Sequence, residues 1–426
     1  MNVKYKLLYT ILINITLVLI AFVTSLIISN ILGPEGFGVY KYIILVATTL
    51  TLLANMGLPD MLIVKLSKKE INLKEYLLGV LTGVAPIYII LGSVLFYYLF
   101  GKENLQDKPL VIIALLYCLI YQINSICQQS ILALDKLIKF QLFEISKQAI
   151  VLCLSITLYY FFTINIFNLF SSLLIANFIA IGYVTYLLLK DKTRGKLKLP
   201  FSKDLIKNSL RFYAFNTMNF FTSRIDIYIL KWSFTESFYM IGIYSLALTL
   251  AEKLWIVPEA IRSVLFLELS NKRKGDDFVA SLLRLLTFFM VIVGIIVGFC
   301  SIVIIPLLFP KFYESVVPFL LLLPGALFYC YSKMLGVYFT INEMLMVNTY
   351  SSVIVLSINI ILNILLIPKY NILGASMAKS VAFIIGASYH FYKFSRVSKI
   401  QFQDLLLIKQ NDFITIKSMI KNRKTS

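Results

Sequence analysis

The sequence is a succession of apolar runs, each about 20 residues of Leu, Ile, Val, Phe and Tyr, separated by short clusters of charge. A helix of about that length crosses the roughly 30 Å hydrocarbon layer of a membrane. In lipid the backbone satisfies its hydrogen bonds only in helices or closed barrels, and barrel strands would alternate in polarity over about ten residues. We therefore expect an all-α polytopic membrane protein with about 12 transmembrane helices. The predicted spans are 8–32, 39–64, 76–100, 109–134, 141–163, 167–190, 208–232, 239–267, 278–309, 315–341, 346–367 and 371–394.

The composition excludes a large soluble core. Hydrophobic residues make up 59% of the 426 residues, whereas soluble domains contain about 45–50%. The formal net charge of +19 would favour nucleic acid as the partner of a soluble protein, but here Lys and Arg gather in short loops. Cytoplasmic loops of membrane proteins carry such an excess. The pattern predicts cytoplasmic N- and C-termini and no nucleic-acid partner.

The longest polar insert, 191–207, divides the chain into two halves. We predict an N-terminal six-helix bundle at 1–190, a basic cytoplasmic linker at 191–207 and a C-terminal six-helix bundle at 208–396. An even number of spans gives both halves one orientation, so we expect two parallel repeats around a central cationic cavity. Basic and apolar residues alternate at 397–426, which predicts an amphipathic basic tail on the cytoplasmic membrane surface.

Charged residues inside the apolar runs form the candidate site. A charge at bilayer depth costs about 2.5–3.5 kcal/mol on insertion scales, so such residues normally face a bundle interior or an aqueous cavity. The predicted substrate-binding residues are Arg224, Asp226, Lys253, Arg262, Lys333 and Lys379. The candidates for coupling transport to an ion are Asp226, Glu252 and Glu259.

Each of these residues also has a structural interpretation. Arg224 and Asp226 are two positions apart, so they do not face each other on one helix and each needs a partner elsewhere. That partner could form a purely structural pair with another span. Arg262 approaches the cytoplasmic end of its predicted span, where a long basic side chain can reach the interface.

Other chemistries find little support in the sequence. The single histidine, His390, has no sequence neighbours that would complete a metal site or a catalytic triad. The GxxxxGK[ST] motif that cradles ATP phosphates does not occur. We therefore expect a protein that is not an enzyme and holds no cofactor, with transport driven either by a proton or sodium gradient or by downstream consumption of the product.

Several motifs together resemble a family of membrane transporters. They are 32–40 (LGPEGFGVY), 55–58 (NMGL), 224–226 (RID), 242–247 (GIYSLA), 306–310 (PLLFP), 323–326 (LPGA) and 367–378 (IPKYNILGASMA). Their order over nearly the whole chain is similar to that of the Wzx-type O-antigen or polysaccharide repeat-unit flippases. These flippases form part of the polysaccharide transport branch of the multidrug/oligosaccharidyl-lipid/polysaccharide exporter superfamily. Asn371 stands where the family usually has Gly, in a turn where Asn tolerates left-handed geometry.

The resemblance implies a task and partners. An oligosaccharide repeat unit linked to undecaprenyl pyrophosphate would cross the bacterial inner membrane by alternating access, for O-antigen or a similar surface polysaccharide. A polysaccharide polymerase and a chain-length regulator would act with the flippase.

Three alternatives stay open. They are a drug/cation antiporter of the same superfamily, a lipid II flippase, and a membrane glycan polymerase or ligase. The excess of intramembrane Lys and Arg argues against the antiporter. The short predicted outer loops argue against the polymerase or ligase, because they leave little room for a catalytic site.

Overall fold

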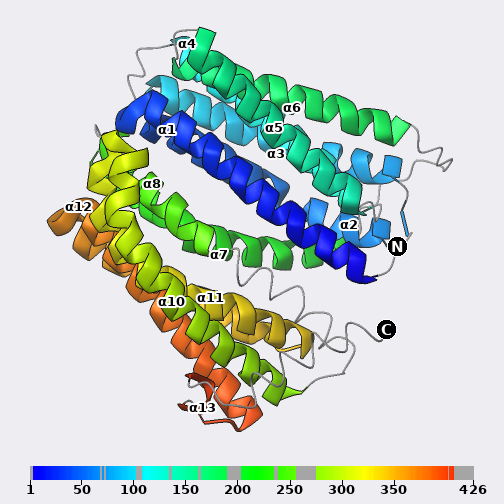
Figure 1. The fold of residues 1–426 in the computed structure, drawn as a ribbon. Helices are drawn as coiled ribbons and strands as arrows, with labels where there is room; N and C mark the ends of the chain where they lie inside the picture. Colours follow the sequence, from blue (N-terminus) through cyan, green and yellow to red (C-terminus); the bar gives the residue numbers. More distant parts are fainter. Residues whose placement is uncertain are drawn as a thin grey trace. The chain divides into compact units, whose positions relative to one another are not determined.

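The computed structural model describes residues 3–67, 70–71, 73–101, 108–133, 137–161, 165–189, 203–234, 238–255, 275–401 and 403–406. Every regular element in these ranges is a helix, and no strand occurs among them (Figure 1). The expected all-α class is therefore confirmed. The chain divides into two compact units, Met1–Phe220 and Phe221–Ser426. The division falls inside α7 (Lys203–Ser233), later than the predicted linker 191–207, most of which lies outside the described ranges.

The helices are divided between the two units. Before α7, unit 1 contains α1 (Val3–Asn55), α2 (Leu58–Ser67), α3 (Leu73–Gly101), α4 (Lys108–Ala133), α5 (Leu137–Phe161) and α6 (Ile166–Leu189). After α7, unit 2 contains α8 (Phe238–Glu252), η1 (Lys253–Trp255), α10 (Asp276–Leu308), η2 (Pro310–Ser315), α11 (Val316–Ile341), α12 (Leu345–Ser398) and α13 (Gln403–Leu406).

The two longest helices, α1 and α12, are each interrupted by one residue with positive φ. In α1 this residue is Gly33 (φ 66°, ψ 179°), in a region that is essentially restricted to glycine. In α12 it is Asn371 (φ 52°, ψ −131°). Gly374 lies so close to Leu366 that a Cβ on Gly374 would overlap the backbone of Leu366. In a straight helix two residues eight positions apart would be separated by about 12 Å along the axis. The chain therefore reverses at Asn371, and α12 is a tight hairpin of two arms, as two separate predicted spans require.

The predicted span 39–64 is not one continuous helix. Met56 and Gly57 have positive φ (43° and 71°), and α2 begins at the next residue. A Cβ on Gly57 would overlap the main-chain oxygen of Ser209 on α7. The break lets unit 1 pack its backbones closely at this point. Hydropathy did not reveal it, because apolar residues continue on both sides of the break.

The helix order agrees with the predicted number of spans. With the arms of α1 and α12 counted separately, and α2 taken as the continuation of the second arm of α1, the described residues form twelve long helices. In unit 2, α10, α11 and the two arms of α12 follow in the order of α3 to α6 in unit 1, and α4 and α11 each have 26 residues. This correspondence fits two repeats of one helix order.

Length and hydropathy of the described helices identify a multi-pass membrane protein. Five described segments are long and apolar enough to cross a membrane. These are Thr16–Asn55, Glu75–Val94, Asp276–Leu308, Pro310–Ile341 and Leu345–Ser398. On α10, Phe299 and Leu307 are 73% and 72% exposed, which suits side chains that face lipid.

The start of the C-terminal tail is part of the protein core. Leu405 in α13 is fully buried and belongs to one hydrophobic cluster with Met334 and Phe394. The Arg284 Nη1 donates a hydrogen bond to the main-chain oxygen of Asp404 at 2.8 Å. Leu405 therefore packs against unit 2, and the membrane-surface role of the tail 397–426 stays a prediction. Residues 407–426 of the predicted tail lie outside the described ranges.

Candidate functional site

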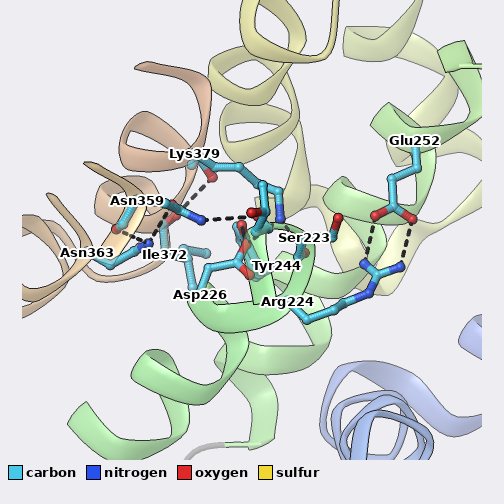
Figure 2. A network of polar contacts seen from close by, with 11 residues as sticks. Ser223, Arg224, Asp226, Tyr244, Glu252, Asn359, Asn363, Ile372 and Lys379 are labelled. Atoms are coloured by element: carbon cyan, nitrogen blue, oxygen red, sulfur yellow. Dashed lines mark hydrogen bonds and ion pairs between the residues drawn. The ribbon is translucent and has the colours of Figure 1, made fainter. Parts of the chain in front are cut away.

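Two charged residues of α7, Arg224 and Asp226, form two separate ion pairs within unit 2 (Figure 2). Arg224 and Asp226 are two positions apart on this helix, so their side chains leave it in different directions. Arg224 reaches Glu252 at the end of α8, and Asp226 reaches Lys379 on the second arm of α12. The expectation that each would need a partner from another element is confirmed.

The Arg224–Glu252 pair is bidentate and partly open. The Nη1–Oε1 distance is 2.7 Å and the Nη2–Oε2 distance is 3.2 Å. The two side chains are 33% and 20% exposed. Parallel N–H···O bonds of this kind are the fork geometry that guanidinium groups offer to carboxylates and phosphates. A cation with this geometry and with access from outside can exchange one oxyanion for another.

The Asp226–Lys379 pair is closed. The Lys379 Nζ lies 2.9 Å from Asp226 Oδ2, and both side chains are 0% exposed. The same ammonium donates a hydrogen bond to the main-chain oxygen of Ser223 at 2.6 Å. The Tyr244 hydroxyl, from α8, donates to Asp226 Oδ2 as well. This conformation therefore keeps Asp226 and Lys379 away from any substrate.

Two asparagines on the first arm of α12 extend the buried network. Asn359 Nδ2 donates to the main-chain oxygen of Thr222 at 3.4 Å. Asn363 Nδ2 donates to both the main-chain oxygen and Oδ1 of Asn359, each at 2.7 Å. Both asparagines are 0% exposed. The sequence interpretation missed them, although two amides four residues apart in an apolar run mark one polar helix face.

Two of the other predicted cations, Lys253 and Lys333, lie near η1, the turn that follows α8. Lys253 is half-buried in η1, directly after Glu252. Lys333 on α11 lies over the ring of Trp255, with Nζ 4.9 Å from the ring centre. The Trp255 Nε1 donates to the main-chain oxygen of Ala326 at 3.3 Å, which fixes the ring. Lys253 and Lys333 therefore place positive charge beside the same turn.

Charge is balanced within the two pairs but not around them. Among the described residues, Arg224 with Glu252 and Asp226 with Lys379 each form a neutral pair, and Lys253 and Lys333 are two further basic side chains near these pairs. Arg262 and Glu259, the remaining predicted site residues, lie outside the described ranges. Within those ranges no group of three or more His, Cys, Asp or Glu side chains is placed to hold a metal ion.

Comparisons with known proteins concern both sequence and fold. A family model described as "Polysaccharide biosynthesis protein" matches residues 3–266. No curated protein matches the sequence.

Solved structures share the fold over nearly the whole chain. A structure of the lipid II flippase MurJ in an inward closed conformation has a TM-score of 0.75 at 17% identity, covering 97% of this chain and 92% of that chain. An inward-facing multidrug resistance MATE family transporter of the MOP superfamily has a TM-score of 0.64 at 13% identity, covering 92% and 99%. A MOP superfamily transporter from Pyrococcus furiosus has a TM-score of 0.61 at 12% identity, covering 91% and 94%. At these identities the likeness establishes the fold.

Proposed function

Since the chain belongs to the polysaccharide biosynthesis protein family, whose model matches more than half of it, we propose that it is a flippase for lipid-linked oligosaccharides. The proposed substrate is a repeat unit of O-antigen or a similar surface polysaccharide on undecaprenyl pyrophosphate. It would cross the bacterial inner membrane by alternating access. The fold shared with a structure described as a lipid II flippase supports a lipid-linked substrate.

The observation that carries the proposal is the partly exposed, bidentate Arg224–Glu252 pair. A pyrophosphate does not enter hydrocarbon without cations, and a guanidinium fork fits phosphate oxygens as well as it fits a carboxylate. A pyrophosphate that reached Arg224 would take over both N–H donors, and Glu252 would be released. The carboxylate thus holds the guanidinium in place until an oxyanion arrives.

Two neighbouring cations strengthen this assignment. Lys253 follows Glu252 in the chain, and Lys333 lies over Trp255 in the same turn. The charge of a pyrophosphate exceeds what one guanidinium neutralises, so point charges from lysine complement the fork. We assign Arg224, Lys253 and Lys333 to the recognition of the pyrophosphate and keep Arg262 as a further candidate.

The antiporter alternative predicts the opposite charge. A drug/cation antiporter binds positively charged substrates, for which an anionic site would be expected. In the described part of unit 2, the only partly exposed carboxylate in this network, Glu252, is already paired with Arg224. The likeness to a multidrug resistance transporter is a likeness of fold, and it does not change the charges of the residues at this site.

Complementation of a flippase-null strain tests the proposal. Wild type should restore surface polysaccharide, whereas Arg224→Ala should lower it at least about tenfold at an unchanged membrane level, because one charge-assisted fork contributes roughly 1.5–3 kcal/mol. Arg224→Lys should restore part of the activity, since an ammonium keeps the charge but loses the fork. Lys369→Ala is the matched control, because Lys369 is an exposed cation of unit 2 outside the network.

Two outcomes would contradict parts of the proposal. Full activity of Arg224→Ala at a normal membrane level would remove Arg224 from the pathway and leave the pair with a structural role. Failure of wild type in every repeat-unit background, together with efflux of cationic dyes by the same cells, would favour the antiporter.

A further inference from the structure

The ammonium of Lys379 lies in the interior of unit 2 and contacts two oxygen atoms. The side chain is 0% exposed, with Nζ 2.9 Å from Asp226 Oδ2. The main-chain oxygen of Ser223 is 2.6 Å from the same nitrogen. A charge at this depth in a membrane protein is costly and usually marks a function.

The polar groups around this ammonium come from two helices, α7 and α8. Asp226 and Ser223 belong to α7, and Tyr244 belongs to α8 and donates its hydroxyl hydrogen to Asp226 Oδ2. The second oxygen of the carboxylate, Oδ1, is buried and accepts no hydrogen bond from the described residues. Arg224, the nearest other cation on α7, is directed to Glu252 and does not serve this carboxylate. A carboxylate and a main-chain carbonyl are the oxygen ligands with which membrane proteins bind alkali cations.

We propose that Lys379 is a tethered cation: its ammonium occupies a monovalent-cation site of unit 2, so the chain itself supplies the charge that a free sodium or potassium ion would otherwise bring. The Asp226–Lys379 pair is neutral, and a further cation beside it would leave a net buried charge, which is strongly unfavourable. Asp226, a predicted ion-coupling residue, is then neutralised by the chain, and any ion coupling has to use other groups, such as Glu252. This inference goes beyond the proposed function, because it concerns charge balance inside unit 2 and is tested without transport.

The test compares thermal unfolding of the purified full-length protein in chloride salts of choline, sodium, potassium and methylammonium at equal ionic strength. Wild type should have the same apparent Tm in all four salts. Lys379→Ala removes the ammonium but keeps the Asp226 carboxylate and the Ser223 carbonyl. Its apparent Tm in choline should fall by roughly 10 °C, as expected when one partner of a buried pair is lost. Sodium, potassium or methylammonium should restore at least half of that loss, and the recovery should saturate with concentration.

Two control variants separate a cation site from a structural pair. Asp226→Asn combined with Lys379→Met removes both charges, so its apparent Tm should not depend on the cation. Lys333→Ala removes a lysine of the same unit that lies over Trp255, and its apparent Tm should not depend on the cation either. If Lys379→Ala is destabilised equally in all four salts while the double variant is stable, the pair is structural only and the proposal is wrong.

Sodium binding to the wild-type protein tests the proposal even if Lys379→Ala does not accumulate in membranes. Saturable binding of radioactive sodium to wild type, removed by Asp226→Asn, would show that a free ion reaches this carboxylate and would overturn the proposal. Absence of such binding in wild type, with recovery of Lys379→Ala by sodium, potassium or methylammonium, would support it. Loss of polysaccharide transport in the complementation assay bears on the proposed function and leaves these outcomes unchanged.

Discussion

Asn371 forms the corner of the α12 hairpin with φ 52° and ψ −131°. This is the conformation of the first corner of a type II′ turn, where glycine is favoured because a Cβ is strained. The positive φ expected at Asn371 is confirmed. The ψ value, however, lies outside the left-handed helical region of about +30° to +60° in which asparagine is best tolerated. The residue that usually stands here in the resembling family, glycine, is therefore the one that the backbone favours.

Asn371→Gly should raise the apparent Tm. Relief of the strained conformation contributes roughly 1–3 kcal/mol, and the greater freedom of glycine in the unfolded chain takes back about 0.4–1 kcal/mol. A net gain of about 1 kcal/mol corresponds to roughly 2–4 °C for a unit of this size. Asn371→Ala should lower the apparent Tm, since alanine keeps the Cβ and loses the polar side chain. Thermal unfolding of the three proteins decides the matter, and a fall in both variants would mean that the asparagine side chain, not the backbone, stabilises the turn.

At the scale of helices, unit 2 depends on close approach of backbones. The Gly325 N–H donates to Ser380 Oγ at 2.8 Å, which joins α11 to the second arm of α12. A Cβ on Gly325 would overlap the backbone of Ser380, and a Cβ on Gly386 would overlap Val355 on the opposite arm. Small residues at such contacts let membrane helices pack tightly, because lipid provides no hydrophobic driving force between them.

Gly325→Ala should separate α11 from the second arm of α12 and destabilise unit 2. Overpacking of a close contact costs about 1–3 kcal/mol, or roughly 5 °C in apparent Tm. Gly182→Ala in α6 is the matched control, because a Cβ there meets no atom within 4 Å. The control should unfold at the wild-type temperature or slightly above, since alanine is the better helix former. An equal loss of apparent Tm in the two variants would contradict this, because Gly182→Ala creates no close contact, and the approach of Ser380 would then not be the cause.

The helices could be predicted from the sequence because the length of an apolar run is a local property. The break at Gly57 could not, since it depends on the approach of Ser209 from a distant helix. For the same reason the spacing of Arg224 and Asp226 predicted that they need different partners but did not identify those partners.

The pairing within the site depends on packing that periodicity does not encode. Lys379 was expected to bind substrate, a role that stays a prediction, and the structure places it against Asp226 with no exposure. The hairpin at Asn371 determines which residue of α12 contacts α7. A hydropathy pattern does not contain this information, because it does not show which residues of different helices are close together. Arg262 and Glu259 stay predictions, because they lie outside the described ranges.

For the whole molecule, the distribution of charge and the number of spans predict an orientation in the membrane. With both termini predicted in the cytoplasm, every even-numbered connection, including the turn at Asn342 and Glu343, is predicted on the cytoplasmic side. The first arm of α12, a run of roughly 26 residues, is about 39 Å long at 1.5 Å per residue. The two ends of that arm, near Glu343 and Lys369, are therefore predicted on opposite sides of the membrane.

Labelling of single cysteines tests this orientation. Glu343 and Lys369 are both exposed, so Glu343→Cys and Lys369→Cys should react with a membrane-impermeant maleimide wherever the reagent reaches them. The five native cysteines are first replaced by serine or alanine, and this cysteine-free protein is the background control. In cells with a permeable outer membrane, Lys369→Cys should react, whereas Glu343→Cys should react only after the inner membrane is broken. The reverse result would place both termini outside. The C-terminal end of α7 would then face the cytoplasm, whereas the positive-inside pattern predicts the N-terminal end there, and a substrate in the cytoplasm would reach Arg224 from that other end.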